Sequence, residues 1–381
     1  MIEVSKRLNT VKEYYFSKKL KEVSSLISKG EPVINLGIGS PDLTPMPKVI
    51  EALKNSLSDL KAHKYQSYQG INELRKAMAT FYGNKYNIDF NPENEILPLM
   101  GSKEGIMHIS MAYLNENDSV LIPNPGYPTY SSVTKLVGAK PIYYDLKPQN
   151  NWQPDLNEFE KIDLSKVKLM WINYPNMPTG VSGDKNSLQK LINFANEKNI
   201  LLVNDNPYSF ILNDNPTSIF NFEGSKKNCL ELNSLSKSFN MAGWRVGMLL
   251  GSPRHIQNVL KVKSNMDSGM FYGIQKGAIE ALNSSNDWFI ELNKIYQMRR
   301  RLIWKLASKL ECSFDQNSSG LFVWAKLPNG LKSEKFIDHL LYEKKIFVTP
   351  GTVFGSNGEG YIRFSLCANK NIINEAIERV K

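Results

Sequence analysis

The sequence predicts an α/β fold: a large domain with a mostly parallel sheet covered by helices, plus a smaller α+β domain built from both chain ends. Between about residues 95 and 252, short apolar runs alternate with helical patterns, which is typical of βαβ units. After about residue 285 a long helical stretch precedes mixed strands and short helices. The amphipathic N-terminal segment is expected to pack against this last part. The predicted limits are 1–45 and 285–381 for the small domain and 46–284 for the large one.

Six apolar runs are the predicted strands of the large domain, and a helical pattern over 187–199 separates two of them. Ligands of such sheets bind at the carboxyl ends of the strands, so polar residues at those ends are candidates for a site. In the small domain a helix is expected over 287–310, with strands at 321–327, 346–351 and 360–367. The strands of the large domain are expected at 119–127, 140–146, 168–175, 200–208, 229–237 and 247–252.

Composition limits the classes of partner. The 381 residues are 41% hydrophobic, which is enough for a sizeable core, and the net charge is +10. Positive charge permits nucleic acid, a membrane surface or a small anion as partner. Lysines are scattered among acids, however, and the densest basic run, residues 299–301, is expected to be a solvated helix face. With no nucleic-acid motif and no apolar run of membrane-spanning length, we expect neither nucleic acid nor membrane as partner.

The cysteines and histidines indicate neither disulfides nor a metal. Three cysteines are widely spaced without a CxxC pair, which fits a reducing cytoplasm. The first thirty residues lack the apolar segment of a signal peptide, so a cytoplasmic location is expected. The histidines show no ligand spacing, and no metal site is predicted. These residues are Cys229, Cys312 and Cys367, and His63, His108, His255 and His339.

A lysine flanked by serines carries the strongest chemical signal. In residues 234–247, SLSKSFNMAGWRVG, Lys237 follows an apolar strand and precedes Arg245 by eight residues. A buried lysine without a carboxylate is costly unless it is neutral or covalently used. The hydroxyls of Ser234 and Ser236, with the guanidinium, suit a phosphate dianion. SxSK alone would indicate a surface loop, but the fourteen-residue string favours a functional site.

That string resembles the cofactor-lysine motif of fold-type I, class I/II pyridoxal-phosphate aminotransferases. The resemblance implies that pyridoxal 5′-phosphate forms a Schiff base with Lys237, which also serves as the catalytic base. Further similar motifs follow in the family's order over nearly the whole chain. They are NLGIGSPD (35–42), YQSYQG (65–70), GSKEG (101–105), PNPGYP (123–128), NYPNMPTG (173–180), NDNPY (204–208) and YIRFS (361–365).

Three residues are expected to contact the cofactor ring. Asp205 ends an apolar strand, where its carboxylate can keep a pyridine nitrogen protonated; an aspartate in a local turn is the alternative. Tyr208 resembles the family tyrosine that donates to the cofactor O3′. Tyr127 corresponds to the aromatic residue that stacks on the ring, and a core tyrosine is the alternative.

The phosphate site is expected at a helix N-terminus, where backbone amides favour anions. Ser102 and Lys103 open a helical pattern and match one phosphate-binding motif of the family, while Ser234 and Arg245 match the other. Tyr65 matches a tyrosine that reaches the phosphate of the neighbouring subunit. The resemblance therefore implies a homodimer whose active sites are shared between subunits.

The substrates implied by the resemblance are an L-amino acid and a 2-oxo acid, with 2-oxoglutarate as the expected acceptor. Arg363 resembles the arginine that grips the substrate α-carboxylate, because its planar fork suits a two-point contact. Gly39 matches a backbone contact to the same group. Tyr14, Tyr15 and residues 267–273 are candidates for the side-chain pocket or for plain core packing.

One position departs from the family pattern. Met177 precedes Pro178 where most members carry an asparagine that donates to O3′, and methionine cannot donate. Asn176 or Asn173 could supply the missing donor; otherwise we expect a raised pKa of the Schiff base. The Met177–Pro178 bond is a candidate cis peptide.

Two other functions share this fold. A carbon-sulfur β-lyase would use Lys237, Asp205 and Tyr208 equally well. A non-catalytic pyridoxal-phosphate-binding regulator is more remote, because such proteins carry a fused helix-turn-helix domain for which this chain has no room. Lys103 resembles the diaminopimelate aminotransferase branch, but one lysine does not decide the donor.

Overall fold

A computed structural model of the chain describes residues 2–11 and 15–380. Its centre is a seven-stranded sheet in the order β2-β8-β7-β6-β5-β3-β4. β8 runs antiparallel to both of its neighbours, whereas the other neighbouring pairs are parallel. The predicted mostly parallel sheet is therefore confirmed. Its strands are β2 (Ile96–Leu99), β3 (Ser119–Asn124), β4 (Lys140–Asp145), β5 (Val167–Ile172), β6 (Leu201–Asp205), β7 (Cys229–Ser234) and β8 (Gly247–Gly251).

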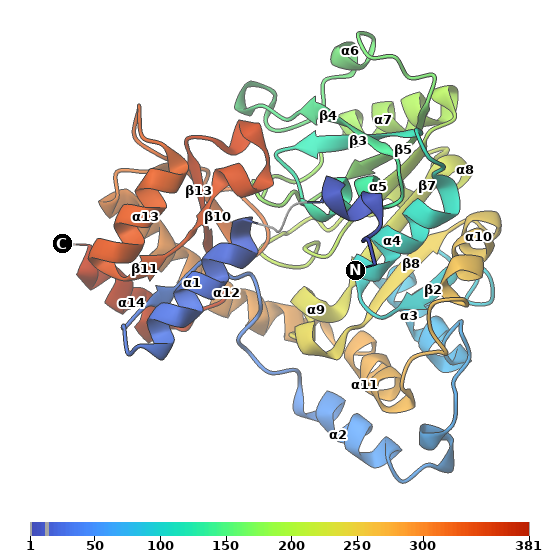
Figure 1. The fold of residues 1–381 in the computed structure, drawn as a ribbon. Coiled ribbons are helices and arrows are strands. Elements are labelled where there is room, and N and C mark those ends of the chain that lie inside the picture. Colours follow the sequence, from blue (N-terminus) through green and yellow to red (C-terminus); the bar gives the residue numbers. More distant parts are fainter. Residues whose placement is uncertain (1, 12–14, 381) are drawn as a thin grey trace.

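Helices cover both faces of this sheet (Figure 1). Alternate strand residues belong to two hydrophobic clusters, as the two-residue period of a strand requires: Leu169 and Trp171 lie in one, Met170 and Ile172 in the other. The first cluster includes side chains of α4 (Ser102–Tyr113), α5 (Thr129–Leu136) and α10 (Pro253–Lys263). The second includes side chains of α3 (Asn72–Tyr86), α7 (Lys185–Lys198) and α11 (Tyr272–Leu282).

The C-terminal part forms a second layered unit, to which the N-terminal part of the chain contributes. A four-stranded antiparallel sheet has the order β12-β13-β10-β9. β1 (Ile34–Asn35) pairs in parallel with β11 (Ile346–Phe347), and Figure 1 shows α1 (Tyr15–Ser28) beside these C-terminal elements. The predicted domain limits themselves stay a prediction. The strands are β9 (Ser313–Phe314), β10 (Phe322–Lys326), β12 (Thr349–Pro350) and β13 (Tyr361–Ser365), and the helices are α12 (Asn286–Lys309), α13 (Ser333–Lys344) and α14 (Lys370–Arg379).

The basic run of α12 is not wholly solvated, which corrects one expectation. Arg299 is 3% exposed and forms a two-point ion pair with Asp42, with Nη–Oδ distances of 2.6 and 2.9 Å. Arg301 is exposed. Consecutive helical residues point about 100° apart, so a run of three arginines cannot share one face. Among the described helices, none combines the length and the apolar character needed to cross a membrane.

Candidate active site

A cavity of about 330 Å³ lies at the carboxyl ends of the parallel strands. Asp205 is the last residue of β6 and Ser234 the last of β7, while Asn173 directly follows β5. The N-terminus of α4 and side chains of β10 and β13 complete the walls. The lining residues are Gly39, Ser102, Lys103, Tyr127, Tyr130, Asn173, Met177, Asp205, Pro207, Tyr208, Ser234, Ser236, Lys237, Ala242, Arg245, Phe322 and Arg363.

Lys237 projects into this cavity from a short helix, α9 (Leu235–Ser238), directly after β7. The hydroxyl of Ser234 begins the helix by accepting a hydrogen bond from the amide of Ser236. Lys237 Nζ lies 2.6 Å from the carbonyl oxygen of Gly39. Burial lowers the pKa of Lys237, and the nearby Arg363 and Arg245 lower it further. A lowered pKa increases the fraction of the neutral, nucleophilic amine relative to that of an exposed lysine.

Asp205 faces the cavity with one carboxylate oxygen unpaired. Its Oδ2 accepts a hydrogen bond from the hydroxyl of Tyr130 at 2.8 Å. Its Oδ1 is buried and has no hydrogen-bond partner among the described residues. Burial raises the pKa of Asp205 to about 6. A buried carboxylate oxygen at a cavity wall fits a ring N–H donor, which is what the pyridine nitrogen of pyridoxal phosphate offers when protonated.

One end of the cavity is built for a dianion. Ser102 and Lys103 lie in the first turn of α4, a twelve-residue helix whose N-terminal amides carry partial positive charge. Gly101 precedes them with φ 87°, and a Cβ there would lie 2.1 Å from Nη2 of Arg245. The guanidinium thus reaches over the helix N-terminus only because residue 101 lacks a side chain. With the hydroxyls of Ser234 and Ser236, these groups fit a phosphate.

Arg363 lies at the other end, in the middle of β13. It is 6% exposed and lies between the rings of Phe322 and Phe354, with its Cζ 3.9 and 4.6 Å from their centroids. Nη2 donates to the carbonyl oxygen of Gly37 at 3.0 Å. Two aromatic faces and a backbone acceptor fix the guanidinium plane, as a two-point grip on a carboxylate requires.

Met177 lies against Arg363 rather than leaving a gap. Its Sδ is 3.1 Å from Nη1 of Arg363, and the Met177–Pro178 peptide is cis, which confirms the prediction made for that bond. Asn173 lines the cavity, but its Oδ1 accepts from the amide of Met177 at 2.7 Å and its Nδ2 donates to the carbonyl oxygen of Asp205. Both polar atoms of the Asn173 side chain are therefore engaged in hydrogen bonds to the backbone.

Comparison with known proteins decides the family. The model of aminotransferase class I and II matches residues 31–380. The chain belongs to this family. LL-diaminopimelate aminotransferases of Halothermothrix orenii and Aquifex aeolicus are each 38% identical, over 100% of this chain and 98% and 99% of theirs. This is therefore a pyridoxal-phosphate-dependent aminotransferase, and of the three functions that the sequence left open the family supports this one.

Solved structures agree with the fold of the aminotransferase. Substrate-bound BacF from Bacillus subtilis superposes with a TM-score of 0.95 at 34% identity, over 100% of this chain and 97% of that one. Aspartate aminotransferase from Thermotoga maritima superposes with a TM-score of 0.91 at 29% identity, over 99% and 98%. The fold class and the resemblance inferred from the motifs are confirmed.

Most of the residues expected at the site of this enzyme line the cavity, but two do not. Asn176 is buried outside the lining, where its Oδ1 accepts from the amide and hydroxyl of Thr179. Tyr65 is 91% exposed, away from the cavity of its own chain. No residue of 267–273 lines the cavity, and the side chains of Tyr14 and Tyr15 fall outside the described part of the structure.

Tyr130 and Phe322 are the contributors that the motifs did not predict. Tyr130 follows Tyr127 by three residues, so the string PGYPTY places a second tyrosine close to the first along the chain. Phe322 pairs with Ser365 across β10 and β13. Its place beside Arg363 follows from strand register, for which the sequence carries no local signal.

Proposed function

We propose that the enzyme transfers an amino group between an L-amino acid and a 2-oxo acid, with Lys237 holding the cofactor and carrying the proton. The supporting observation is that the Lys237 amine shares one cavity with the Asp205 carboxylate, the α4 N-terminus and Arg363. Bound pyridoxal phosphate would supply an electron sink for charge that develops at the substrate Cα. Asp205 would hold the ring nitrogen protonated and Tyr127 would cover the ring face.

Lys237 is suited to act as the general base. Burial lowers the pKa of its amine, which raises the neutral fraction near pH 7. The carbonyl of Gly39 holds the amine at 2.6 Å, and the carbonyl of Gly37, two residues earlier, holds Arg363. One short backbone segment thus sets the relative positions of the base and of the group that grips the substrate carboxylate.

We further propose dicarboxylic substrates, with 2-oxoglutarate as acceptor and LL-diaminopimelate as donor. Both molecules carry a second carboxylate, and Lys103 provides a second cation on the same cavity as Arg363. The full-length relatives at 38% identity bear the name LL-diaminopimelate aminotransferase. BacF matches at similar identity, so the donor needs a direct test.

The test is a single-turnover panel of amino donors on the cofactor-loaded enzyme. LL-diaminopimelate, glutamate, aspartate, alanine and phenylalanine are each mixed with enzyme, and conversion of the cofactor to its amine form is followed by absorbance. We expect fastest conversion with LL-diaminopimelate and reversal on adding 2-oxoglutarate. Equal rates for all donors contradict the donor assignment. Pyruvate and ammonia released from cystathionine without a 2-oxo acid would instead identify a β-lyase.

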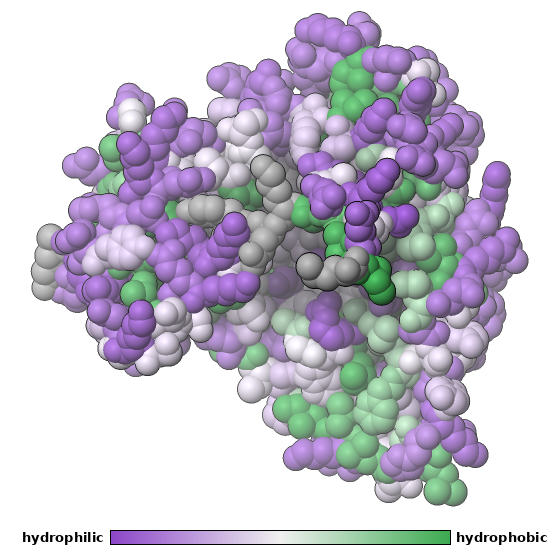
Figure 2. Space-filling model, in the orientation of Figure 1, coloured by the Kyte–Doolittle hydropathy of each residue, from purple (hydrophilic) through white to green (hydrophobic). Residues whose placement is uncertain are grey.

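We also propose a homodimer with shared active sites. Apolar side chains are exposed on one region around α2 (Pro47–Ser56) and α11, and Figure 2 shows hydrophobic surface there, at the lower edge of the view. This apolar region neighbours Tyr65, which the resemblance assigns to the partner's phosphate. Its exposed members are Leu57, Leu60 and Phe271. A cytoplasmic location stays a prediction.

Mixing two variant subunits tests whether each active site uses residues of both chains. Tyr65→Ala and Lys237→Ala chains each lack one required group, but a mixed dimer has one site with both. Refolding them together should restore about one quarter of the wild-type activity, since half of randomly formed dimers are mixed and each has one complete site. A mixture no more active than its parents contradicts shared sites, and a monomer in sedimentation contradicts the dimer.

A further inference from the structure

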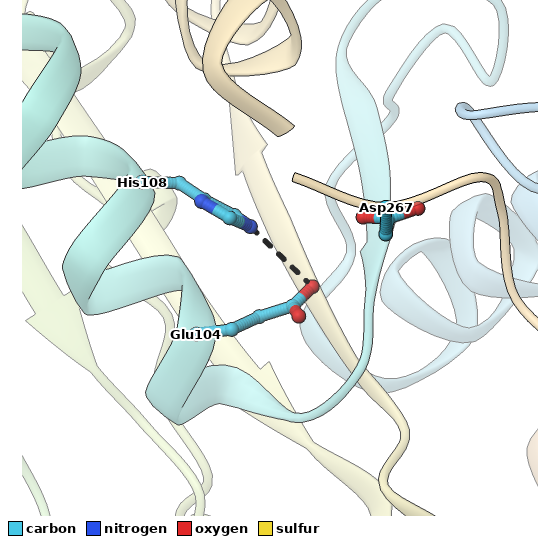
Figure 3. A group of neighbouring side chains, drawn as sticks. All are labelled: Glu104, His108 and Asp267. Carbon is cyan, nitrogen blue, oxygen red and sulfur yellow. Dashed lines mark ion pairs between the residues drawn. The ribbon is translucent and has the colours of Figure 1, made fainter. Parts of the chain in front are cut away.

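Three potential metal ligands meet beside the phosphate-binding turn (Figure 3). Glu104 and His108 lie four residues apart on α4, so they share one face of the helix. Asp267 approaches from the segment between α10 and α11. One ligand atom from each residue lies within 4.8 Å of the other two.

His108 is the unusual member of this group. It is 3% exposed, and neither ring nitrogen has a hydrogen-bond partner among the described residues. Its Nε2 lies 3.8 Å from Oε1 of Glu104, too far for a hydrogen bond. Figure 3 shows the imidazole directed toward Glu104 and the side where Asp267 lies. A buried polar group left unpaired destabilises the fold, and an ion bound between these side chains would remove that cost.

The two carboxylates, by contrast, are already oriented by other groups. Glu104 Oε1 accepts from the amide of Met100 at 2.8 Å. Asp267 accepts from the ammonium of Lys263 at 2.9 and 2.8 Å and from the amide of Gly269 at 2.7 Å. A carboxylate has about four lone-pair positions, so both can keep these bonds and still bind a metal. Such outer contacts commonly hold metal ligands in place.

The charge balance also favours a cation. Lys263 is 1% exposed and pairs with Asp267, which leaves Glu104 with no lysine or arginine partner among the described residues. Glu104 directly follows Ser102 and Lys103, which line the cavity where the phosphate is expected to bind. A divalent ion at this position would reverse the sign of the local charge and so remove repulsion of that anion.

We propose that Glu104, His108 and Asp267 bind one Zn²⁺ ion, with water as the fourth ligand. One imidazole and two carboxylates are ligands that zinc accepts, at about 2.0–2.2 Å. Ligand atoms in a tetrahedral set at those lengths lie about 3.3–3.6 Å apart, so the three side chains need to close by roughly 1 Å. The ion ties the first turn of α4 to the segment that precedes α11. The sequence predicted no metal site because Asp267 is far along the chain from the helical pair.

The experiment measures zinc on chelator-treated, cofactor-loaded enzyme. Isothermal titration with Zn²⁺ should show one tight site per chain, and His108→Gln should weaken it by about 100-fold or more, since even outer contacts of a metal commonly contribute 10–100-fold. His255→Gln is the matched control: His255 is 8% exposed, but it already bonds Tyr113 at 2.6 Å and lies outside the cluster. Wild-type affinity in this control is expected.

Wild-type protein that binds no stoichiometric zinc overturns the proposal, as does equal affinity in wild type and His108→Gln. If the variant does not fold, Co²⁺ replaces Zn²⁺ in the wild-type chain. Intense visible absorption of four-coordinate cobalt supports the site, and the weak spectrum of hydrated Co²⁺ overturns it. Neither measurement depends on the identity of the amino donor.

Discussion

The hydroxyl of Tyr130 donates a 2.8 Å hydrogen bond to Oδ2 of Asp205, while the buried Oδ1 of the same carboxylate has no hydrogen-bond partner among the described residues. Tyr130 is fixed by its own packing, because its ring stacks on Trp171 at 4.9 Å with 4° between the planes. The carboxylate is therefore held in one orientation, with its second oxygen toward the cavity. A buried carboxylate oxygen without a partner is destabilising, so a donor that reaches Oδ1 would stabilise this carboxylate.

Replacing Asp205 by Asn should stabilise the cofactor-free protein while impairing the enzyme. Burial raises the pKa of Asp205 from 3.8 to about 6, so the folded state binds the extra proton between about pH 4 and 6 and stability falls as pH rises through that window. At pH 7 the variant should gain about 2–3 kcal/mol of unfolding free energy. The gain should vanish near pH 3, whereas turnover should fall by about 100-fold or more. Urea unfolding at both pH values and steady-state rates check this; a variant less stable at pH 7 contradicts it.

Tyr130→Phe removes the only donor to that carboxylate seen within the described chain. We expect a loss of about 1.5–3 kcal/mol in unfolding free energy at pH 8, where Asp205 is charged. The hydrogen bond from Tyr130 lowers the pKa of Asp205, so the loss should shrink once the pH falls below about 6. Tyr144→Phe is the control, because its buried hydroxyl donates to a neutral group, the carbonyl oxygen of Trp171, at 2.7 Å. Similar pH dependence in both variants would argue against a special Tyr130–Asp205 pair.

Lys237→Ala should abolish both turnover and the absorbance of the Schiff base. Lys103, the other lysine that lines the cavity, belongs to the phosphate-binding turn and is not held beside Gly39 as Lys237 is. The variant should still bind pyridoxal phosphate, because the groups around α4 and Asp205 remain. Absorbance spectra test the loss of the Schiff base, dialysis tests the retained binding of the cofactor, and rate measurements test the loss of turnover. Near-wild-type transamination by Lys237→Ala would refute the assignment of this lysine.

Arg363→Lys should cost substrate affinity even though charge is conserved. The ammonium of lysine is not planar, so it cannot pack between the rings of Phe322 and Phe354 as the guanidinium does. It also cannot make a two-point contact with a carboxylate. We expect kcat/KM to fall by about 100-fold, corresponding to about 3 kcal/mol. Arg300→Lys, which alters an arginine stacked on Trp304 in α12, serves as control and should keep normal kinetics. An unchanged KM in Arg363→Lys would disprove the role.

Met177→Asn should lower the pKa of the Schiff base, because it restores a donor that methionine lacks. The structure strengthens this expectation: Asn173 is engaged by two backbone groups, and Asn176 lies outside the cavity lining. Spectral pH titrations of wild type and variant compare the two values directly. Coincident titration curves would leave no role for the missing donor.

The sequence by itself determined the sheet, the order of the motifs and the lysine. Each of these features is local: an apolar run of strand length, the glycine at the α4 turn and the serines around Lys237 each occupy only a few consecutive residues. Because strands in a mostly parallel sheet share one carboxyl edge, Asp205 and Ser234 were bound to meet there. Their convergence on one cavity followed from topology alone.

Only the tertiary structure decided which distant side chains fill the spaces between these motifs. Burial of Arg299 depends on Asp42, the plane of Arg363 depends on Phe322 and Phe354, and the setting of His108 depends on Asp267. Each contact joins segments far apart in the chain, and its distance is set by packing and strand register. A sequence pattern records the periodicity of its own element but not the side chain that will face it, so such partners had to be seen in three dimensions.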